Sequence, residues 1–312
     1  MSVRDEFPSA RISNGRVEAV VYLPDAERGF YRGPRFDWSG MVAVLRCGGH
    51  DFFGEWKDAP HDPLGNDFVV GPACEFGMGP ETGNPSPPGF EDAAPGATFL
   101  KIGVGELRRP DEAPYHFGAA YQIVQPAPWV VRKGDAWIEF RQEARIGPGW
   151  GYRYVKRIEL ASDRPEMLVR YTLENAGDRR LRQTWYCHNF IRVDDHRVGT
   201  GYRLELPFAP KLSRVVGEAV EALGNGVAFV KDLGPSEGIF AVIEGHGSHP
   251  SHNAVVVRCA PGAAAVRIKG DAPVCKFHLF ATGLAVCPEL FVAIDLEPGA
   301  SRTWSDRYTL EV

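Results

Sequence analysis

Hydrophobic and polar positions change over short intervals along this chain. Short runs of apolar, β-branched and aromatic residues alternate with Gly, Pro, Asn and Asp, which is the pattern of strands joined by turns. The runs cover residues 17–23, 41–46, 68–70, 98–107, 121–124, 129–132, 136–143, 152–160, 167–174, 183–191, 203–206, 227–230, 239–244, 255–259, 264–269, 276–281, 291–296 and 302–312. The best helical period, at 219–223, is short and weak. The pattern predicts an all-β protein, a sandwich or barrel, with little helix.

Length and composition fit one large all-β unit. The chain has 312 residues, with 35 Gly and 25 Pro, and it shows no repeat of the kind that marks a solenoid or propeller. We therefore expect a single domain spanning residues 1–312. The formal net charge is −5 and the pI is about 6.0. Neither value favours binding to nucleic acid or to an anionic membrane.

Cysteine usage and the N-terminal segment bear on location. The six cysteines are Cys47, Cys74, Cys187, Cys259, Cys275 and Cys287. They show no CxxC spacing, so no zinc or redox motif is predicted, and most lie in apolar runs typical of reduced core residues. Residues 1–16 are polar, without an apolar signal segment, and no apolar run is long enough for a transmembrane helix. We expect a cytoplasmic protein.

One histidine-rich segment, residues 244–252, has a spacing that could bind a metal ion. His246, His249 and His252 are each separated by two residues. Gly, Ser and Pro lie between them and no carboxylate is spaced to complete a site, so a solvated turn is the favoured interpretation. No metal site is predicted.

The run at 183–191 ends in a polar pair, His188 and Asn189. By the two-residue period of strands, Thr184, Tyr186 and His188 share one face, and Trp185, Cys187 and Asn189 share the other. The pair is costly to bury without partners, so a hydrogen-bond network holds it or it faces a cleft. Glu289 stands alone at the start of a later apolar run. A histidine and a carboxylate, each where a strand meets a loop, are the parts of an acid–base pair.

Two further segments carry possible binding residues. Arg35 could form forked hydrogen bonds to vicinal hydroxyls or a carboxylate; alternatively it pairs with Asp37 or packs on Trp38. Glu75 lies between glycines and is either a site carboxylate or a turn residue. The Gly/Pro-rich loop at 77–97 follows it, and we expect this loop to border a ligand cleft, with disorder as the alternative.

Three parts of the sequence, in this order, resemble the aldose 1-epimerase (galactose mutarotase-like) superfamily. They are residues 31–40; residues 173–177 with 186–190; and residues 287–291 with 296–299 and Trp304. Together they extend over nearly the whole chain. The resemblance implies a large antiparallel β-supersandwich with a sugar on its concave face. It also implies that His188 is the general acid and Glu289 the general base of a cofactor-free reaction.

The resemblance makes a small carbohydrate the expected partner and Arg35 the expected sugar-binding arginine. With it we predict Glu75, Asn189 and Trp38 as substrate-binding residues, Trp38 by stacking on a pyranose. The predicted activity interconverts α and β anomers: a base takes the anomeric hydroxyl proton while an acid protonates the ring oxygen. Two alternatives stay open, a non-catalytic sugar-binding protein on the same fold and a lyase or hydrolase using Glu75 and Glu289 as paired carboxylates.

Overall fold

Strands dominate the computed structural model, which describes residues 4–147 and 149–312. Strands make up 49% and helix 2%, which confirms the all-β prediction. Within these described residues, the helical turns are two short 3-10 segments, η1 (Pro80–Thr82) and η2 (Pro250–His252). The helical period at 219–223 was misleading, because these residues form strand β16 (Val220–Leu223), which pairs with β17 (Gly226–Phe229).

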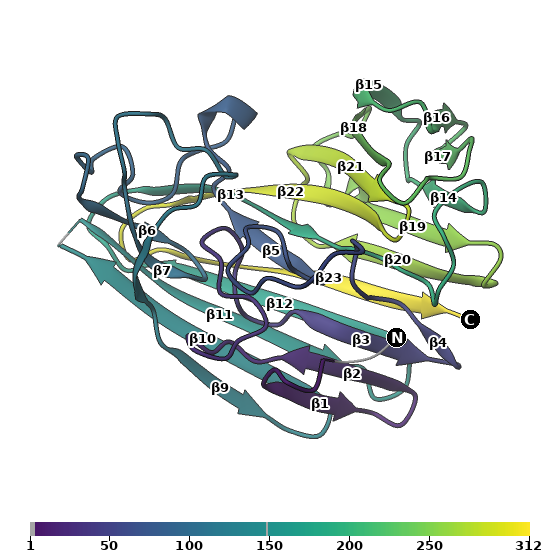
Figure 1. Ribbon diagram of the computed structural model, residues 1–312, viewed down its shortest axis with the longest axis horizontal. Coiled ribbons are helices and arrows are strands. Elements are labelled where there is room, and N and C mark those ends of the chain that lie inside the picture. The colour runs from purple at the N-terminus through teal and green to yellow at the C-terminus, as the bar shows by residue number, and fades with distance from the viewer. Residues whose placement is uncertain (1–3, 148) are drawn as a thin grey trace.

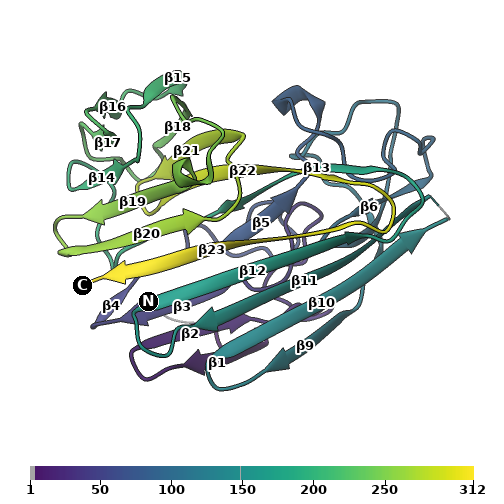
Figure 2. The same cartoon turned by 180° about the vertical axis from the view of Figure 1, so that it is seen from behind.

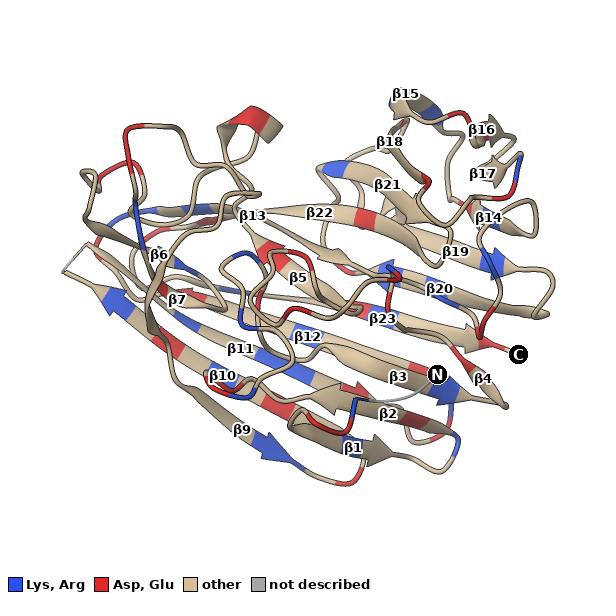
Figure 3. Ribbon diagram, in the orientation of Figure 1, with Lys and Arg blue, Asp and Glu red and all other residues tan. Residues whose placement is uncertain are grey.

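A ten-stranded antiparallel sheet forms one layer of the molecule (Figures 1 and 2). Its order is β16, β17, β14 (Tyr202–Glu205), β19 (Ala254–Cys259), β20 (Ala264–Gly270), β23 (Ser301–Glu311), β12 (Glu166–Asn175), β11 (Trp150–Leu160), β10 (Trp137–Ile146), β9 (Trp129–Lys133). Basic and acidic residues are interspersed along its strands (Figure 3). Arg153, for example, pairs with Glu143 and Glu174 on the two neighbouring strands.

A six-stranded sheet lies against the first and carries the site. Its order is β15 (Lys211–Val216), β18 (Gly238–Glu244), β21 (Lys276–Thr282), β22 (Val286–Leu296), β13 (Leu181–His188), β5 (Ala73–Phe76). Side chains of one face, such as Trp185, Leu279 and Val292, join the main core cluster. Because strand residues alternate between faces, Tyr186 and Glu289 lie on the opposite face.

Two smaller sheets complete the structure. The first contains β1 (Ser9–Ser13), β2 (Val17–Tyr22), β3 (Val42–Cys47) and β4 (His50–Asp51), and the second contains β6 (Thr98–Lys101), β7 (Gly105–Arg108) and β8 (Ile123–Pro126). The predicted run at 98–107 is therefore two strands, separated by a turn in which Gly103 has a φ of 85°. The main core cluster includes both Ile12 and Leu310, so the two ends of the chain share it.

The cysteines depart from expectation at one pair. Cys74 and Cys187 are directly opposed on β5 and β13 and are joined as a disulfide. The prediction of reduced cysteines is wrong for this pair, because their separation of 113 residues hides their contact in the sheet. Disulfides are uncommon in reducing compartments, so cysteine usage no longer supports a cytoplasmic location. Among the described residues, no helix has the length and hydropathy needed to cross a membrane.

Candidate functional site

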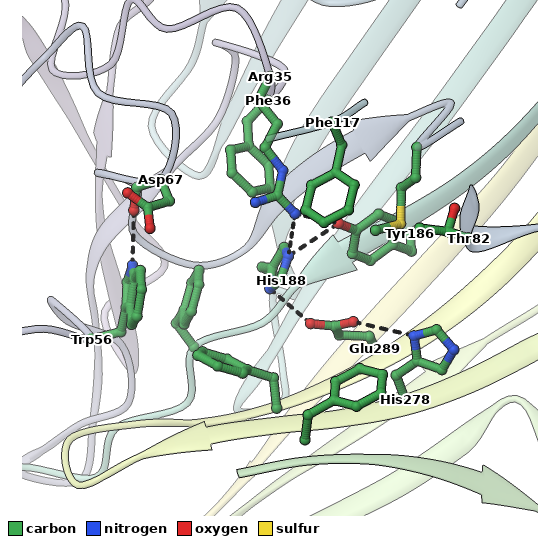
Figure 4. Close-up of a pocket in the computed structure, with 14 residues that line it drawn as sticks. Arg35, Phe36, Trp56, Asp67, Thr82, Phe117, Tyr186, His188, His278 and Glu289 are labelled. Atoms are coloured by element: carbon green, nitrogen blue, oxygen red, sulfur yellow. Dashed lines mark hydrogen bonds and ion pairs between the residues drawn. The ribbon is translucent and has the colours of Figure 1, made fainter. Parts of the chain in front are cut away.

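A cavity of about 430 Å³ opens on the face of the six-stranded sheet that points away from the main core. Strands β13, β18, β21 and β22 supply one part of its wall, and the loops before β5 and around η1 and Phe117 supply the rest (Figure 4). The lining residues are Arg35, Phe36, Trp56, Asp67, Met78, Thr82, Phe117, Tyr186, His188, Phe190, Phe240, His278, Phe280 and Glu289. The cavity thus combines a few ionisable groups with many aromatic rings.

Three neighbouring strands place a carboxylate between two histidines. Glu289 on β22 is the register partner of His278 on β21, and His188 is at the end of the adjacent β13. His188 Nδ1 lies 2.9 Å from Glu289 Oε1, and His278 Nδ1 lies 3.8 Å from Oε2. Burial lowers the pKa of His278, although Glu289 opposes the shift. His188 is therefore the close partner of Glu289. His278 is the more distant one, and its lowered pKa favours the neutral imidazole.

Aromatic rings fix the orientation of the His188 imidazole. The imidazole stacks on Phe190 at 5.1 Å and 9°, and Phe190 in turn stacks on Trp56 at 5.2 Å and 9°. Phe36 meets the imidazole edge-on at 5.2 Å. Phe190 has a φ of 36°, which is strained for a bulky residue and is a recurrent feature of functional sites. The chain thus adopts an unfavourable conformation directly beside the predicted acid.

A buried network holds the other side of His188. The Tyr186 hydroxyl lies 2.5 Å from Glu75 Oε2 and 3.0 Å from His188 Nε2. Arg35 donates from Nε to Glu75 at 2.9 Å and from Nη2 to the Tyr186 hydroxyl at 3.1 Å. Burial and the Glu75 charge raise the pKa of Tyr186 well above its usual value, so the phenol stays protonated and donates to Glu75. The phenol oxygen is then free to accept from His188 and Arg35.

Glu75 keeps its charge because of two cations. Burial by itself would raise the pKa of the Glu75 carboxyl, but Arg35 and Lys101, helped by the Tyr186 hydrogen bond, outweigh burial and lower it. Lys101 is fully buried and lies 3.4 Å from Glu75 Oε1. Burial lowers the pKa of Lys101 to about 8, and Glu75 limits the fall. The carboxylate is thus the shared counter-charge of the buried Lys101 and of Arg35, which is 11% exposed at the cavity.

The predicted site residues fall into two groups. Arg35, His188 and Glu289 line the cavity, whereas Glu75, Trp38 and Asn189 do not. Trp38 is buried and its indole N–H donates to the Gly33 carbonyl at 2.8 Å. Its side chain therefore does not offer the cavity a stacking surface.

Asn189 faces the core, as the strand period requires of the residue after His188. Its Nδ2 donates to the Pro288 carbonyl at 2.6 Å, and its Oδ1 accepts from the Tyr308 hydroxyl at 2.7 Å. Because Tyr308 belongs to β23, this amide braces the two large sheets. Trp38 and Asn189, both predicted to contact the sugar, thus lie outside the cavity lining and bond to other parts of the protein. Glu75 lies behind the cavity wall and holds Arg35 and Tyr186 in place.

Sequence reasoning missed His278 and Phe117. The predicted run at 276–281 contained the signal for His278, because alternation places it on the face opposite Phe277 and Leu279. Phe117 lies in a loop without periodicity, yet its ring and that of Phe36 each approach the Arg35 guanidinium carbon at 4.4 Å. No local pattern in the sequence identifies a contact of that kind.

The loop at 77–97 contributes directly to the cavity through Met78 and Thr82. Lys276 holds this part of the loop, since its Nζ donates to the carbonyls of Thr82 and Gly83 and to Asn84 Oδ1 at 3.0, 2.8 and 2.9 Å. Further along the loop, Phe90 packs in a buried cluster. The loop thus forms one rim of the cavity and is anchored to β21.

One group of side chains in the described part of the chain has metal-ligand spacing. The ligand atoms of His188, Cys287 and Glu289 lie within 4.8 Å of one another. Burial, with the Glu289 charge, raises the pKa of the Cys287 thiol well above its usual value. Since metals bind the thiolate, this environment opposes ligation by Cys287.

Comparisons with known proteins identify the fold. No family model matches the sequence, and no curated protein matches it either. A galactose mutarotase-like protein from Lactobacillus casei has 13% identity and a TM-score of 0.56, over 97% of this chain and 100% of the other. A galactose mutarotase-like protein from Clostridium acetobutylicum has 13% identity and a TM-score of 0.56, over 100% and 97%. A GalM/aldose epimerase homologue from C. elegans has 12% identity and a TM-score of 0.53, over 98% and 99%.

These likenesses extend over nearly the full length of each chain. The protein therefore has the fold of the galactose mutarotase-like and aldose epimerase-like proteins. The resemblance inferred from the three sequence segments is confirmed at the level of the fold.

Proposed function

We propose that this protein is an aldose 1-epimerase-like enzyme that interconverts the α and β anomers of a sugar. The observation that carries the proposal is the 2.9 Å contact between His188 Nδ1 and Glu289 Oε1 in the wall of an aromatic-lined cavity. The anomeric hydroxyl and the ring oxygen of a pyranose are bonded to the same carbon. The His188 imidazole and the Glu289 carboxylate, which are in contact in the cavity wall, are therefore close enough to reach both oxygens of a bound sugar.

The hydrogen-bond network supports one assignment of the two roles. With Tyr186 donating to Glu75, its oxygen accepts from His188 Nε2, and Nδ1 then donates to Glu289. This assignment makes His188 an imidazolium, the acid, and Glu289 a carboxylate, the base. Glu289 takes the proton of the anomeric hydroxyl while His188 gives one to the ring oxygen, and the bond between the anomeric carbon and the ring oxygen breaks. Rotation of the aldehyde and the reverse proton transfers close the other anomer.

Two alternative functions gain less support. A lyase or hydrolase using Glu75 and Glu289 needs both carboxylates at the substrate. Glu75 is fully buried behind the wall and bonded to Arg35, Tyr186 and Lys101. A non-catalytic sugar-binding protein would have no need of a strained Phe190 beside an imidazole–carboxylate pair. Binding of sugars without anomeric exchange would nevertheless favour the non-catalytic sugar-binding function.

Exchange spectroscopy by NMR tests the proposal directly. A panel of aldoses is measured with and without protein, together with the variants His188→Asn and Glu289→Gln. Each substitution should reduce the catalysed exchange rate by about 10²-fold or more. His61→Asn and Glu55→Gln are matched controls, because both residues lie outside the cavity lining. Binding of a sugar without exchange in the wild-type protein would overturn catalysis and support the sugar-binding alternative.

A further inference from the structure

Most hydrogen-bonding groups of the cavity wall already have partners in the protein. Trp56 donates its only N–H to the Asp67 carbonyl at 3.1 Å. The Thr82 hydroxyl donates to the Gly79 carbonyl at 2.8 Å and accepts from Asn84 at 2.7 Å. The Tyr186 hydroxyl is bonded to Glu75. These groups have little capacity left for a ligand.

The groups that remain available are few. Among the described lining residues, the side-chain nitrogens without a hydrogen-bond partner in the protein are Arg35 Nη1 and the two ring nitrogens of His278, whose Nδ1 lies 3.8 Å from Glu289 Oε2. Asp67 adds a carboxylate, but its side chain is 45% exposed and is paired with Lys57 at 2.7 Å. His188 and Glu289 are reserved for the ring oxygen and the anomeric hydroxyl by the proposed reaction. An ordinary hexose, which carries a hydroxyl on nearly every carbon, offers more groups than this wall can satisfy.

The rest of the wall is apolar. Phe240 and Phe280 are register partners on β18 and β21, and both rings face the cavity with Met78 and Phe117. A sugar hydroxyl held against these side chains loses water without gaining a partner, which is unfavourable. A hydrogen or methyl group at the same place instead removes apolar surface from water.

We propose that the preferred substrate is a deoxy-sugar, an aldose in which a hydrogen replaces at least one hydroxyl of the ordinary hexose. This inference rests on the proposed function for the position of the anomeric centre. The deoxy edge lies against the apolar wall of Met78, Phe117, Phe240 and Phe280. Arg35 and His278 bind the hydroxyls that remain. Selectivity comes from the unpaired hydroxyl of the competing sugar.

Matched sugar pairs test the proposal. D-fucose is compared with D-galactose, and 6-deoxy-D-glucose and 2-deoxy-D-glucose are compared with D-glucose. For each sugar, kcat/KM is taken from NMR exchange and Kd from calorimetry with wild-type protein. In at least one pair the deoxy sugar should have a kcat/KM about 10- to 100-fold higher and a Kd about 10- to 100-fold lower than its parent. This is the range over which an apolar pocket discriminates against an added hydroxyl.

The two measurements separate this proposal from the proposed function. Exchange in which every parent sugar equals or exceeds its deoxy partner overturns the deoxy preference and leaves the epimerase function standing. Tighter binding of a deoxy sugar without any exchange supports the substrate class and overturns the epimerase function. Absence of both exchange and binding across the panel overturns both.

A variant pair locates the selectivity. Phe280→Tyr adds a hydroxyl to the wall and should reduce the preference for the deoxy sugar by several-fold, because the parent hydroxyl gains a partner. Phe7→Tyr is the matched control, since Phe7 contacts Tyr22 and Phe30 outside the cavity lining. An equal change of the preference in Phe280→Tyr and Phe7→Tyr contradicts the assignment of this wall. So does a preference that stays the same in Phe280→Tyr and in the matched Phe→Tyr substitutions at Phe240 and Phe117.

Discussion

The substitution Glu75→Gln tests whether one carboxylate holds the framework behind the site. Its oxygens lie 2.9 Å from Arg35 Nε and 3.4 Å from Lys101 Nζ; Glu75 and Lys101 are fully buried, and the Arg35 side chain is 11% exposed. At an effective dielectric constant of about 20, unit charges at these separations attract by roughly 6 and 5 kcal/mol. Glutamine keeps the shape and an acceptor oxygen but removes the charge. Arg35 and the fully buried Lys101 then lose their shared counter-charge.

The expected loss of unfolding free energy is about 3–5 kcal/mol, the cost of removing one partner of a buried ion pair. For a chain of 312 residues, an unfolding entropy of about 2 cal/mol/K per residue converts this to a fall in Tm of about 5–8 °C. Differential scanning calorimetry measures it. Glu55→Gln is the matched control. Glu55 also pairs with an arginine Nε, at 2.6 Å from Arg4, but the two side chains are 31% and 38% exposed. An exposed pair is worth at most about 1 kcal/mol.

The pH dependence gives a second measurement. In the wild-type protein the pKa of Lys101 is about 8, and Glu75 is the group that raises it. Without that charge the folded pKa falls further, while the unfolded pKa is unchanged. Between those two values only the unfolded chain holds the proton, so stability rises with pH. The loss of unfolding free energy in Glu75→Gln, relative to the wild-type protein, should therefore decrease as the pH rises from 6 to 9. Adding Lys101→Met should remove part of this loss. A melting temperature equal to that of Glu55→Gln at pH 6 would refute the shared counter-charge.

Three further predictions follow from other contacts. Tyr186→Phe removes the hydroxyl that contacts His188 and should lower the catalysed exchange rate by about 10-fold or more, with an unchanged circular dichroism spectrum as the check on folding. Burial, with a nearby carboxylate, raises the pKa of Asp306 to about 7. Its unfolded carboxyl loses the proton first, so wild-type stability falls as the pH rises from about 4 to about 7, and Asp306→Asn should remove up to about 4 kcal/mol of that fall in urea melts. Lys276→Met releases the loop at 82–84 and should speed its cleavage in limited proteolysis, whereas equal cleavage rates would argue against the anchor.

Alternation of apolar and polar positions predicted most of the large sheets. It worked for residues 152–160 and 167–174, which lie in β11 and β12, because each strand buries one face and leaves the other partly exposed. It failed at 98–107, where a glycine turn divides an apolar run into two strands. It also failed at 219–223, since a short run of Val, Glu, Ala and Leu suits either a helix or an edge strand.

The same alternation explains which parts of the site were predicted. His188 ends β13 as predicted, and the structure brings it into contact with Glu289. The predicted position of Glu289 at the start of a strand is wrong, because β22 already begins at Val286. Asn189 was included for its position beside His188, although a shift of one residue moves a side chain to the opposite face. The period places Asn189 against Tyr308 in the core. Strict alternation places Asn189 on the core face and His278 on the face of the site.

The cavity wall could not be predicted in this way, because it depends on contacts between distant loops. Periodicity shows the face on which a strand residue lies, whereas the strand order β21, β22, β13 and its register bring His188, Glu289 and His278 together. It gives no information on which loop covers that face. Arg35 reaches its position through Glu75, 40 residues away, and Lys276 anchors a loop more than 190 residues away. The proposed acid and base thus lie on the regular sheet, whereas much of the cavity wall comes from irregular segments. In the proposed enzyme, substitutions in these loops can therefore change which sugar is bound while the sheet keeps the proposed acid and base in register.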